Sequence, residues 1–341
     1  MLKPLIPYTL KDINPLINYR KGETKFGEKV DLLLTHEQIE EQINSSLAKY
    51  VLIGIPEDAG VIANFGRPGA RNAWQAVLKT LVNIQNNSYL KPKKLLILGH
   101  LDYQKELNAL ENFADDAELY RKNAKALVKK IDDDVTYLVQ HIVKAGKKPI
   151  VVGGGHNNAY GILKGCAIGH GKPLNAINID AHTDFRPSKS RHSGNGFSCA
   201  YKEGFLNKYF IFGIHENYTP AKVFDKLHKN PERVQYNTFE EIEIRQEKEL
   251  TYQINTAMDF IKTDKFGIEI DCDAIKNIPS SAMTSTGFSI EQVRRLLHAF
   301  SSHKNASYLH ICEAAPNSNH ENEQLLTGKL ITTLITDFLK K

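Results

Sequence analysis

Acidic residues and histidines stand at alternate positions after two apolar runs of this sequence. The stretch NAINIDAHTD ends in Asp180, His182 and Asp184. These side chains share one face if the backbone stays extended, because side chains repeat every two residues along a strand. The stretch FGIEIDCD brings Asp271 and Asp273 to one face in the same way. Imidazole and carboxylate groups at such spacing are typical of metal ligands.

Two further candidate residues follow other apolar runs. KPIVVGGGH presents His156 after three glycines, and SYLHICE ends in Glu313. Four aspartates at one buried site would repel one another unless cations compensated their charge. Two divalent cations would balance four carboxylates, and oxygen-rich ligation with two imidazoles favours an ion such as Mn2+. A pair of ions that share a water lowers the pKa of that water, so the predicted reaction class is hydrolysis.

Each motif by itself also has a structural interpretation. A DxHxD or DCD segment can be a polar loop, and a histidine after glycines can lie at the start of a helix. The glycine run could instead indicate a nucleotide-binding loop, but GGGHNNAYG has Asn158 where the third glycine of G-x-G-x-x-G belongs. Independent coincidence after four apolar runs is improbable, which favours a dinuclear metal centre.

Eight short apolar runs alternate with helical patterns and predict the elements that position these side chains. Such runs indicate strands buried on both faces, and their alternation with helices indicates a parallel sheet between helices. They span residues 49–55, 93–99, 148–152, 174–179, 208–214, 234–239, 266–270 and 307–312. Sites in such sheets form beyond the carboxyl ends of the strands, where all four motifs lie. We therefore expect one three-layer α/β/α domain with an eight-stranded, mainly parallel sheet.

Composition and charge exclude several other classes of protein. The net charge is +5, but the lysines are scattered along the chain, so we expect no nucleic-acid partner. Cys166, Cys199, Cys272 and Cys312 form no CxxC pair, which argues against a zinc knuckle or a disulfide framework. No run approaches the roughly 18 apolar residues of a membrane helix, and the first residues lack a signal peptide's features. We expect a cytoplasmic protein without a membrane partner.

Four segments together resemble the motifs of the arginase and agmatinase superfamily of ureohydrolases: GGGHNNAYG, DAHTD, EIDCDAI and CEAAP. GIPEDAGVIANFGRPGARNA, from Gly54, resembles the early substrate-side loop of that superfamily. The resemblance implies an arginase-like domain over residues 1–341, with 1–48 as an N-terminal extension packed on it, and a homo-oligomer of three or six subunits. It also implies two Mn2+ ions per subunit, one held by His156, Asp180, Asp184 and Asp271, the other by Asp180, His182, Asp271 and Asp273.

The segment DFRPSKSRHSGNGF resembles formimidoylglutamases more than arginases. Arginases place a histidine two residues after the SGN tripeptide, where this chain has Phe197. The resemblance implies hydrolysis of a linear amidine, N-formimidoyl-L-glutamate, to L-glutamate and formamide in histidine degradation. Arginine and amide donors suit the two carboxylates of that substrate, and the expected substrate-binding residues are Arg186, Arg191, Asn195 and His215.

The resemblance also implies a catalytic role for Glu313, which would pair with the cationic amidine. Our hypothesis for the proton is that Asp184 or Asp273 relays it to the departing nitrogen. Gly155 stands where the family has aspartate, which leaves open what supports the neighbouring ligand His156.

Several alternatives stay open at the level of the sequence. The loop arginines could be solvent-facing, and His215 could be structural. The substrate could be that of an agmatinase, guanidinobutyrase or arginase, which release urea. A noncatalytic metal-binding protein on this fold is an alternative of a different class. All six predicted ligand positions carry a ligand residue, which argues against it.

Overall fold

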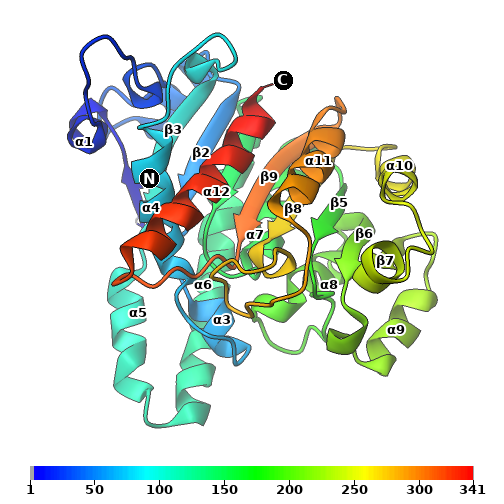
Figure 1. Ribbon diagram of the computed structural model, residues 1–341. Helices are drawn as coiled ribbons and strands as arrows, with labels where there is room; N and C mark the ends of the chain where they lie inside the picture. The colour runs from blue at the N-terminus through cyan, green and yellow to red at the C-terminus, as the bar shows by residue number, and fades with distance from the viewer. Residues whose placement is uncertain (1–3, 341) are drawn as a thin grey trace.

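A nine-stranded sheet runs through the middle of the computed structural model, which describes residues 4–340 (Figure 1). In spatial order it reads β1-β3-β2-β4-β9-β8-β5-β6-β7. The strands are β1 Leu5–Pro7, β2 Tyr50–Gly54, β3 Leu95–Leu101, β4 Lys148–Val152, β5 Leu174–Ile179, β6 Leu206–Ile214, β7 Val234–Thr238, β8 Phe266–Asp271 and β9 Ala306–Cys312. Strands β2 to β9 pair in parallel, as the alternation of apolar runs and helices predicts.

The sequence predicts eight strands, whereas the sheet of the described residues has nine. The additional strand β1 lies within the predicted N-terminal extension and pairs antiparallel with β3 at one edge of the sheet. It has three residues and ends in Pro7, so it is too short to show a period, and proline is tolerated in a sheet mainly at an edge. Its pairing with β3 also attaches residues 5–7 to the sheet.

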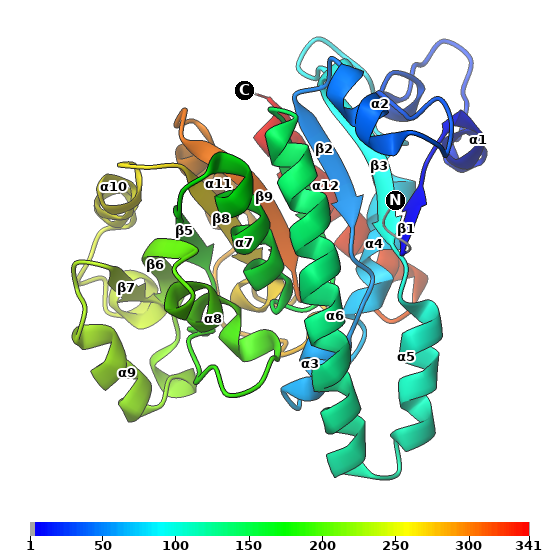
Figure 2. The ribbon, with the colours of Figure 1, turned by 180° about the vertical axis from the view of Figure 1, so that it is seen from behind.

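Helices cover both faces of the sheet. In Figure 1, α4, α11 and α12 lie in front of it, and in Figure 2, α6, α7 and α8 cover the opposite face. The α-helices are α1 Leu10–Ile13, α2 Ile39–Ser45, α3 Ala59–Ala63, α4 Ala73–Leu81, α5 Gln104–Leu110, α6 Ala117–Lys144, α7 Asn158–His170, α8 Gly196–Lys202, α9 Ala221–His228, α10 Leu250–Ile261, α11 Ile290–Ser301 and α12 Glu321–Leu339. Two buried apolar clusters, one on each face, make this a three-layer α/β/α fold.

The four strands that precede the chemical motifs are neighbours at the centre of the sheet. Strands β4, β9, β8 and β5 lie side by side in this order. Because parallel strands end at the same edge, their carboxyl ends bring His156, Glu313, Asp271 and Asp180 together. Segments 115 residues apart in sequence, such as those of His156 and Asp271, thereby come into hydrogen-bond contact.

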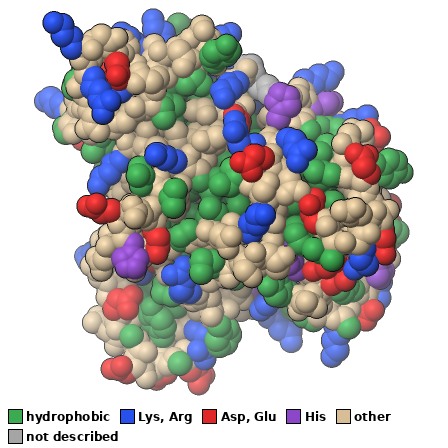
Figure 3. Space-filling model, in the orientation of Figure 1, with side chains coloured by type: hydrophobic (Ala, Val, Ile, Leu, Met, Phe, Trp, Pro, Cys, Tyr) green, Lys and Arg blue, Asp and Glu red, His purple; other side chains and the backbone are tan. Residues whose placement is uncertain are grey.

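Charged side chains are mixed on the face of the molecule seen in Figure 3. Lysines and arginines lie among acidic and apolar residues over the whole of that face. No helix in the described part of the chain has the length and apolar character needed to cross a bilayer.

Candidate metal centre and active site

His156 and three aspartates form a compact group at the carboxyl edge of the sheet. Nδ1 of His156 lies 2.9 Å from Asp184 Oδ2, 3.0 Å from Asp271 Oδ2 and 3.3 Å from Asp180 Oδ2. One ligand atom from each of these four residues lies within 4.8 Å of the others. The side chain of His156 is fully buried, so water can do little to stabilise the negative charge of the group in place of a cation. This group coincides with one of the two ligand sets that the family resemblance implies.

A second group lies beside the first. Nδ1 of His182 is 3.5 Å from Asp180 Oδ1 and 3.9 Å from Asp273 Oδ2. Backbone N–H groups fix the carboxylates of Asp180 and Asp271. Asp180 Oδ1 accepts from the His182 N–H at 2.7 Å, and Asp271 Oδ1 accepts from the Asp273 N–H at 2.7 Å. The structure therefore brings all six predicted ligand residues to one place.

The backbone leaves the extended conformation within the DAHTD segment. Strand β5 ends at Ile179, and Asp184 has a φ of +43°. The three side chains therefore meet through a turn rather than through strand alternation alone. Glu313 also has a positive φ, of +61°. Non-glycine residues in the left-handed region cost free energy and cluster at functional sites.

The electrostatics of the group call for cations. Burial, with Asp180 as neighbour, raises the pKa of Asp184 and of Asp271, and burial also raises the pKa of Asp273. Burial opposes a charged His182, yet the hydrogen bond and charge of Asp180 raise its pKa to about 10. The side chains around these carboxylates thus supply too little positive charge for all of the carboxylates to be ionised at once. Hard divalent cations would supply that charge, and an aspartate and imidazole donor set suits them.

Glu313 faces the same group from the end of β9. Its Oε1 accepts the backbone N–H of His156 at 2.7 Å. Its Oε2 is buried and has no hydrogen-bond partner among the described residues. Burial and the charge of Asp273 raise the pKa of Glu313 to about 8. A buried carboxylate oxygen without a partner is costly unless a donor occupies the space in front of it.

A cavity of about 230 Å³ opens in front of these residues. Its lining includes His182, Asp184, Asp271, Asp273, Glu313 and Arg186. Among the described residues of this lining, Arg186 is the only arginine or lysine. Its side chain is exposed and donates to Asn64 Oδ1 at 3.2 Å. The cavity therefore has an acidic floor and one strongly basic group on its wall.

Arg191 does not line the cavity, contrary to the substrate-binding role expected for it. Its guanidinium is buried and forms hydrogen bonds of 2.8 and 3.1 Å with the Asp132 carboxylate. It also donates to the backbone carbonyl of Asn157 at 2.8 Å. All of these partners belong to α6 or to the loop before α7, so the side chain holds the loop that contains it rather than a ligand.

Asn195 and His215 also lie outside the lining. Asn195 is fully buried, and its amide donates to the carbonyls of Pro187 and Ser190 within its own loop. The ring of His215 is buried and stacks on Tyr218, with ring centroids 5.1 Å apart. Tyr218 itself lines the cavity and stacks on His182, with centroids 5.7 Å apart. His215 therefore supports the cavity wall indirectly.

A family model places this architecture among known proteins. Residues 48–339 match the model of the arginase family. The chain belongs to the arginase family. It is thereby a hydrolase of the class that acts on amidine C–N bonds.

Relatives of the chain within this arginase family include formimidoylglutamases. The chain is 30% identical to that of Hahella chejuensis over 204 residues, which are 57% of this chain and 56% of the relative. It is 24% identical to that of Streptococcus pyogenes serotype M12 over 295 residues, 84% of this chain and 82% of the relative.

Solved structures show the same fold. Formimidoylglutamase from Bacillus subtilis superposes with a TM-score of 0.74 at 17% identity, covering 95% of this chain and 93% of that one. Trypanosoma cruzi formiminoglutamase, solved with Mn2+, gives a TM-score of 0.70 at 17% identity, covering 93% and 99%.

Glu57 is a residue of this arginase-family site that the sequence motifs did not single out. Its carboxylate is fully buried, and its Oε1 accepts from Gly155 N at 3.0 Å, Asn157 Nδ2 at 3.2 Å and Asn158 Nδ2 at 2.8 Å. Glu57 thus places a buried carboxylate against the turn that presents His156, next to Gly155, the position where the family resemblance implied an aspartate. The adjacent acids in GIPED, directly after a predicted strand, were the available signal.

Gly155 itself has no room for a side chain. A Cβ atom there would lie 2.6 Å from Asn157 Oδ1 and 2.9 Å from Val61 Cγ2. The two preceding glycines, Gly153 and Gly154, have positive φ angles of +90° and +73°. The glycine run therefore serves the tight turn before His156.

Phe197 stands where arginases carry a histidine, and it packs under His156. The two rings meet edge to face, with centroids 5.0 Å apart, and Phe197 also stacks on Tyr209 at 4.4 Å. Phe197 is fully buried and cannot donate a proton. Any proton delivered to a leaving amine must come from another group.

Proposed function

We propose that this protein hydrolyses N-formimidoyl-L-glutamate to L-glutamate and formamide, a step of histidine degradation, with two Mn2+ ions per subunit. One observation carries the choice of substrate: Arg186 lies on the wall of the cavity whose floor holds the candidate metal ligands. A guanidinium binds carboxylate groups through paired hydrogen bonds, so it favours a substrate with an acidic end.

The metal ligands follow from the two groups at the carboxyl edge of the sheet. One ion would be held by His156, Asp180, Asp184 and Asp271, and the other by Asp180, His182, Asp271 and Asp273. Such a pair of ions, when bound, lowers the pKa of a shared water and makes it available for hydrolysis at neutral pH. The surplus of buried carboxylates supports this proposal.

The residues of the chain itself bind and orient the amidine. Glu313 lines the cavity, and its Oε2 has no hydrogen-bond partner among residues 4–340, so it would accept hydrogen bonds from a cationic amidine. Because Phe197 is apolar, Asp184 or Asp273 would hold the proton for the departing nitrogen. Asp273 is oriented for this by Ser281 Oγ at 3.2 Å and by the Ala282 N–H at 2.9 Å.

Product analysis tests the proposed reaction. Mn2+-loaded protein would be offered formiminoglutamate, arginine, agmatine and guanidinobutyrate separately, and formamide, glutamate, ammonia and urea would be measured. We expect formamide and glutamate from the first substrate and no urea from the others. Urea from a guanidine substrate would favour the alternative ureohydrolase activities. No metal-dependent turnover of any of the four would favour a noncatalytic metal-binding protein.

Arg186→Ala is expected to raise KM for formiminoglutamate about 10–100-fold, since a hydrogen bond to a charged group contributes roughly 1.5–3 kcal/mol. Turnover number should change little, because the bond forms equally in the ground and transition states. Steady-state kinetics check both values. Lys189→Ala, at an exposed lysine of the same loop outside the cavity lining, is the matched control. An unchanged KM for formiminoglutamate in Arg186→Ala, or an equal rise in Lys189→Ala, would contradict carboxylate recognition by Arg186.

The homo-oligomer of three or six subunits, implied by the family resemblance, is part of the proposal. The molar mass in solution, measured by light scattering, tests it directly.

A further inference from the structure

A buried acid lies behind the candidate metal centre, on the side away from the cavity. Glu269 stands on β8 two residues before Asp271, and its side chain is fully buried. Its Oε1 accepts the hydroxyl of Tyr308 at 2.6 Å, and its Oε2 lies 2.6 Å from Nδ1 of His310. A carboxylate in the interior of a sheet is costly unless it has such partners.

The sheet register builds this arrangement. Glu269 of β8 is paired with His310 of β9, so their side chains stand next to each other. Tyr308 comes two residues earlier on β9 and therefore lies on the same face. Gly267 makes room for it, because a Cβ atom at Gly267 would lie 2.0 Å from the Tyr308 ring. Two side chains thus fix the position of the Glu269 carboxylate.

His156 is oriented between this acid and the candidate metal ligands. Its Nδ1 faces Asp180, Asp184 and Asp271, whereas its Nε2 lies 3.5 Å from Oε2 of Glu269. Nε2 of His156 has no hydrogen-bond partner within the described part of the chain. The carboxylate of Glu269 is an acceptor 3.5 Å from this nitrogen.

We propose that Glu269 is a positioning residue for the metal centre. It holds the ring of His156 in the tautomer with the proton on Nε2, which leaves the lone pair of Nδ1 directed at the metal. Metal-ligating histidines commonly donate their second N–H to a carboxylate, which fixes the ring and raises its basicity. The inference rests on the proposed two-metal function and assigns to it a residue outside the cavity.

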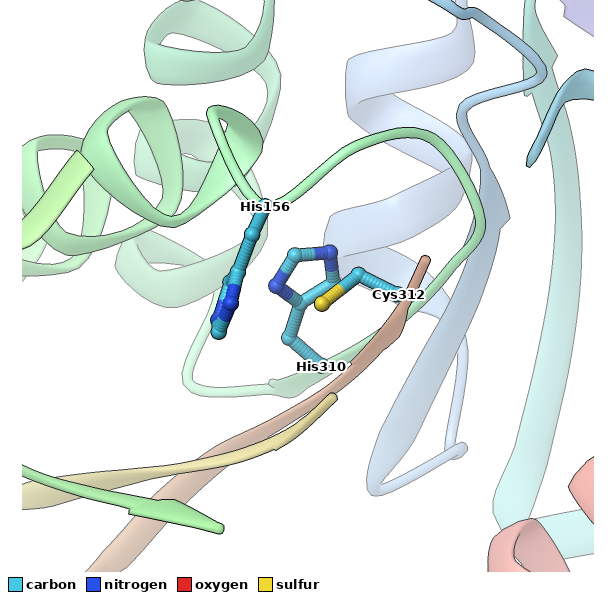
Figure 4. A group of neighbouring side chains, drawn as sticks. All are labelled: His156, His310 and Cys312. Carbon is cyan, nitrogen blue, oxygen red and sulfur yellow. The ribbon is translucent and has the colours of Figure 1, made fainter. Parts of the chain in front are cut away.

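A separate metal site at this position is the competing interpretation. His156, His310 and Cys312 offer ligand atoms that lie close together, and Figure 4 shows the ring of His156 facing the side chains of His310 and Cys312. Nδ1 of His310 is already bonded to Glu269, and Cys312 Sγ donates to the Ile270 carbonyl at 3.8 Å. The contacts therefore favour a hydrogen-bonded support over a third ion.

Glu269→Gln tests the proposal, since the amide keeps the shape and can still accept from Tyr308. Mn2+ binding would be followed by electron paramagnetic resonance titration of the full-length protein. We expect the affinity for the ion of the His156 group to fall about 10–100-fold, and that for the ion of the His182 group to stay near wild type. Excess Mn2+ should restore most of the turnover.

Three further variants sharpen the result. Tyr308→Phe removes one of the bonds that fix Glu269 and should weaken the same ion by a smaller factor, which keeps the proposal testable if Glu269→Gln fails to fold. Ser281→Ala removes a hydrogen bond to Asp273 and should weaken the other ion. Asp337→Asn, in a remote contact with Arg294, should change neither affinity.

The outcomes separate this inference from the proposed function. Wild-type affinity for both ions in Glu269→Gln and Tyr308→Phe, with only the thermal stability of the metal-free protein lowered, would overturn the positioning role. A third ion in the wild type that is lost in Glu269→Gln would also overturn it, in favour of the competing site. Wild-type protein that binds no Mn2+ would overturn the proposed function itself.

Discussion

Asp271→Ala protein should lose both bound Mn2+ ions and its hydrolytic activity together. Asp271 contributes to both proposed ligand groups and contacts Nδ1 of His156 at 3.0 Å. Loss of an outer-shell partner alone typically costs 10–100-fold in activity. Loss of a shared ligand is therefore expected to lower kcat/KM by more than about a hundredfold. Metal content by elemental analysis and steady-state kinetics on the same sample check the prediction.

Asp337→Ala is the matched control for this variant. Asp337 also accepts hydrogen bonds, of 2.6 and 3.2 Å from Arg294, but it lies on α12 and outside the cavity lining. Its replacement should leave metal content and kcat/KM near wild type. Thermal unfolding of the metal-free proteins shows whether each variant is folded. Full activity in metal-depleted Asp271→Ala protein would contradict the two-metal proposal.

Arg191→Met is expected to lower the free energy of unfolding by about 3–5 kcal/mol near pH 8, because it leaves the Asp132 carboxylate buried without its partner. Arg191 bonds this carboxylate through two nitrogens. Urea denaturation measures the change. In Arg191→Met/Asp132→Leu, no buried charge is left unpaired, and much of the stability should return.

The loss in Arg191→Met should also depend on pH. Burial raises the pKa of Asp132 from 3.8 to about 6, although Arg191 lowers it. The folded state therefore binds this proton more tightly than the unfolded state, and the contribution to stability declines as pH rises through about 6. Without Arg191 the carboxyl in the folded state should titrate at still higher pH. The deficit relative to wild type should thus be smaller at pH 5 than at pH 8, and an equal deficit would place the effect in packing alone.

Arg186 and Arg191 stand five positions apart in one polar segment, and composition cannot separate them. The structure places Arg186 on the cavity wall and buries Arg191 against α6. The acid that decides this, Asp132, is 59 residues away in the chain.

Local patterns of the sequence determined the layers of the fold and the set of candidate ligands. Apolar runs alternating with helical patterns indicate parallel strands between helices, because each element must bury its apolar face. The acids and histidines at the ends of those runs point to one edge for the same reason. Strand β1 was not predicted, because three residues are too few to show the alternation of buried and exposed side chains that marks a strand.

Only the tertiary structure decided which residues meet. The spatial order β4-β9-β8-β5 places four motifs beside one another, and the register of β8 on β9 puts Glu269 next to His310. Glu57 reaches Gly155 across 98 positions of sequence. Such contacts depend on strand order, register and burial, which are properties of the whole packed chain, whereas the periodicity of a segment reflects only its own face toward the core.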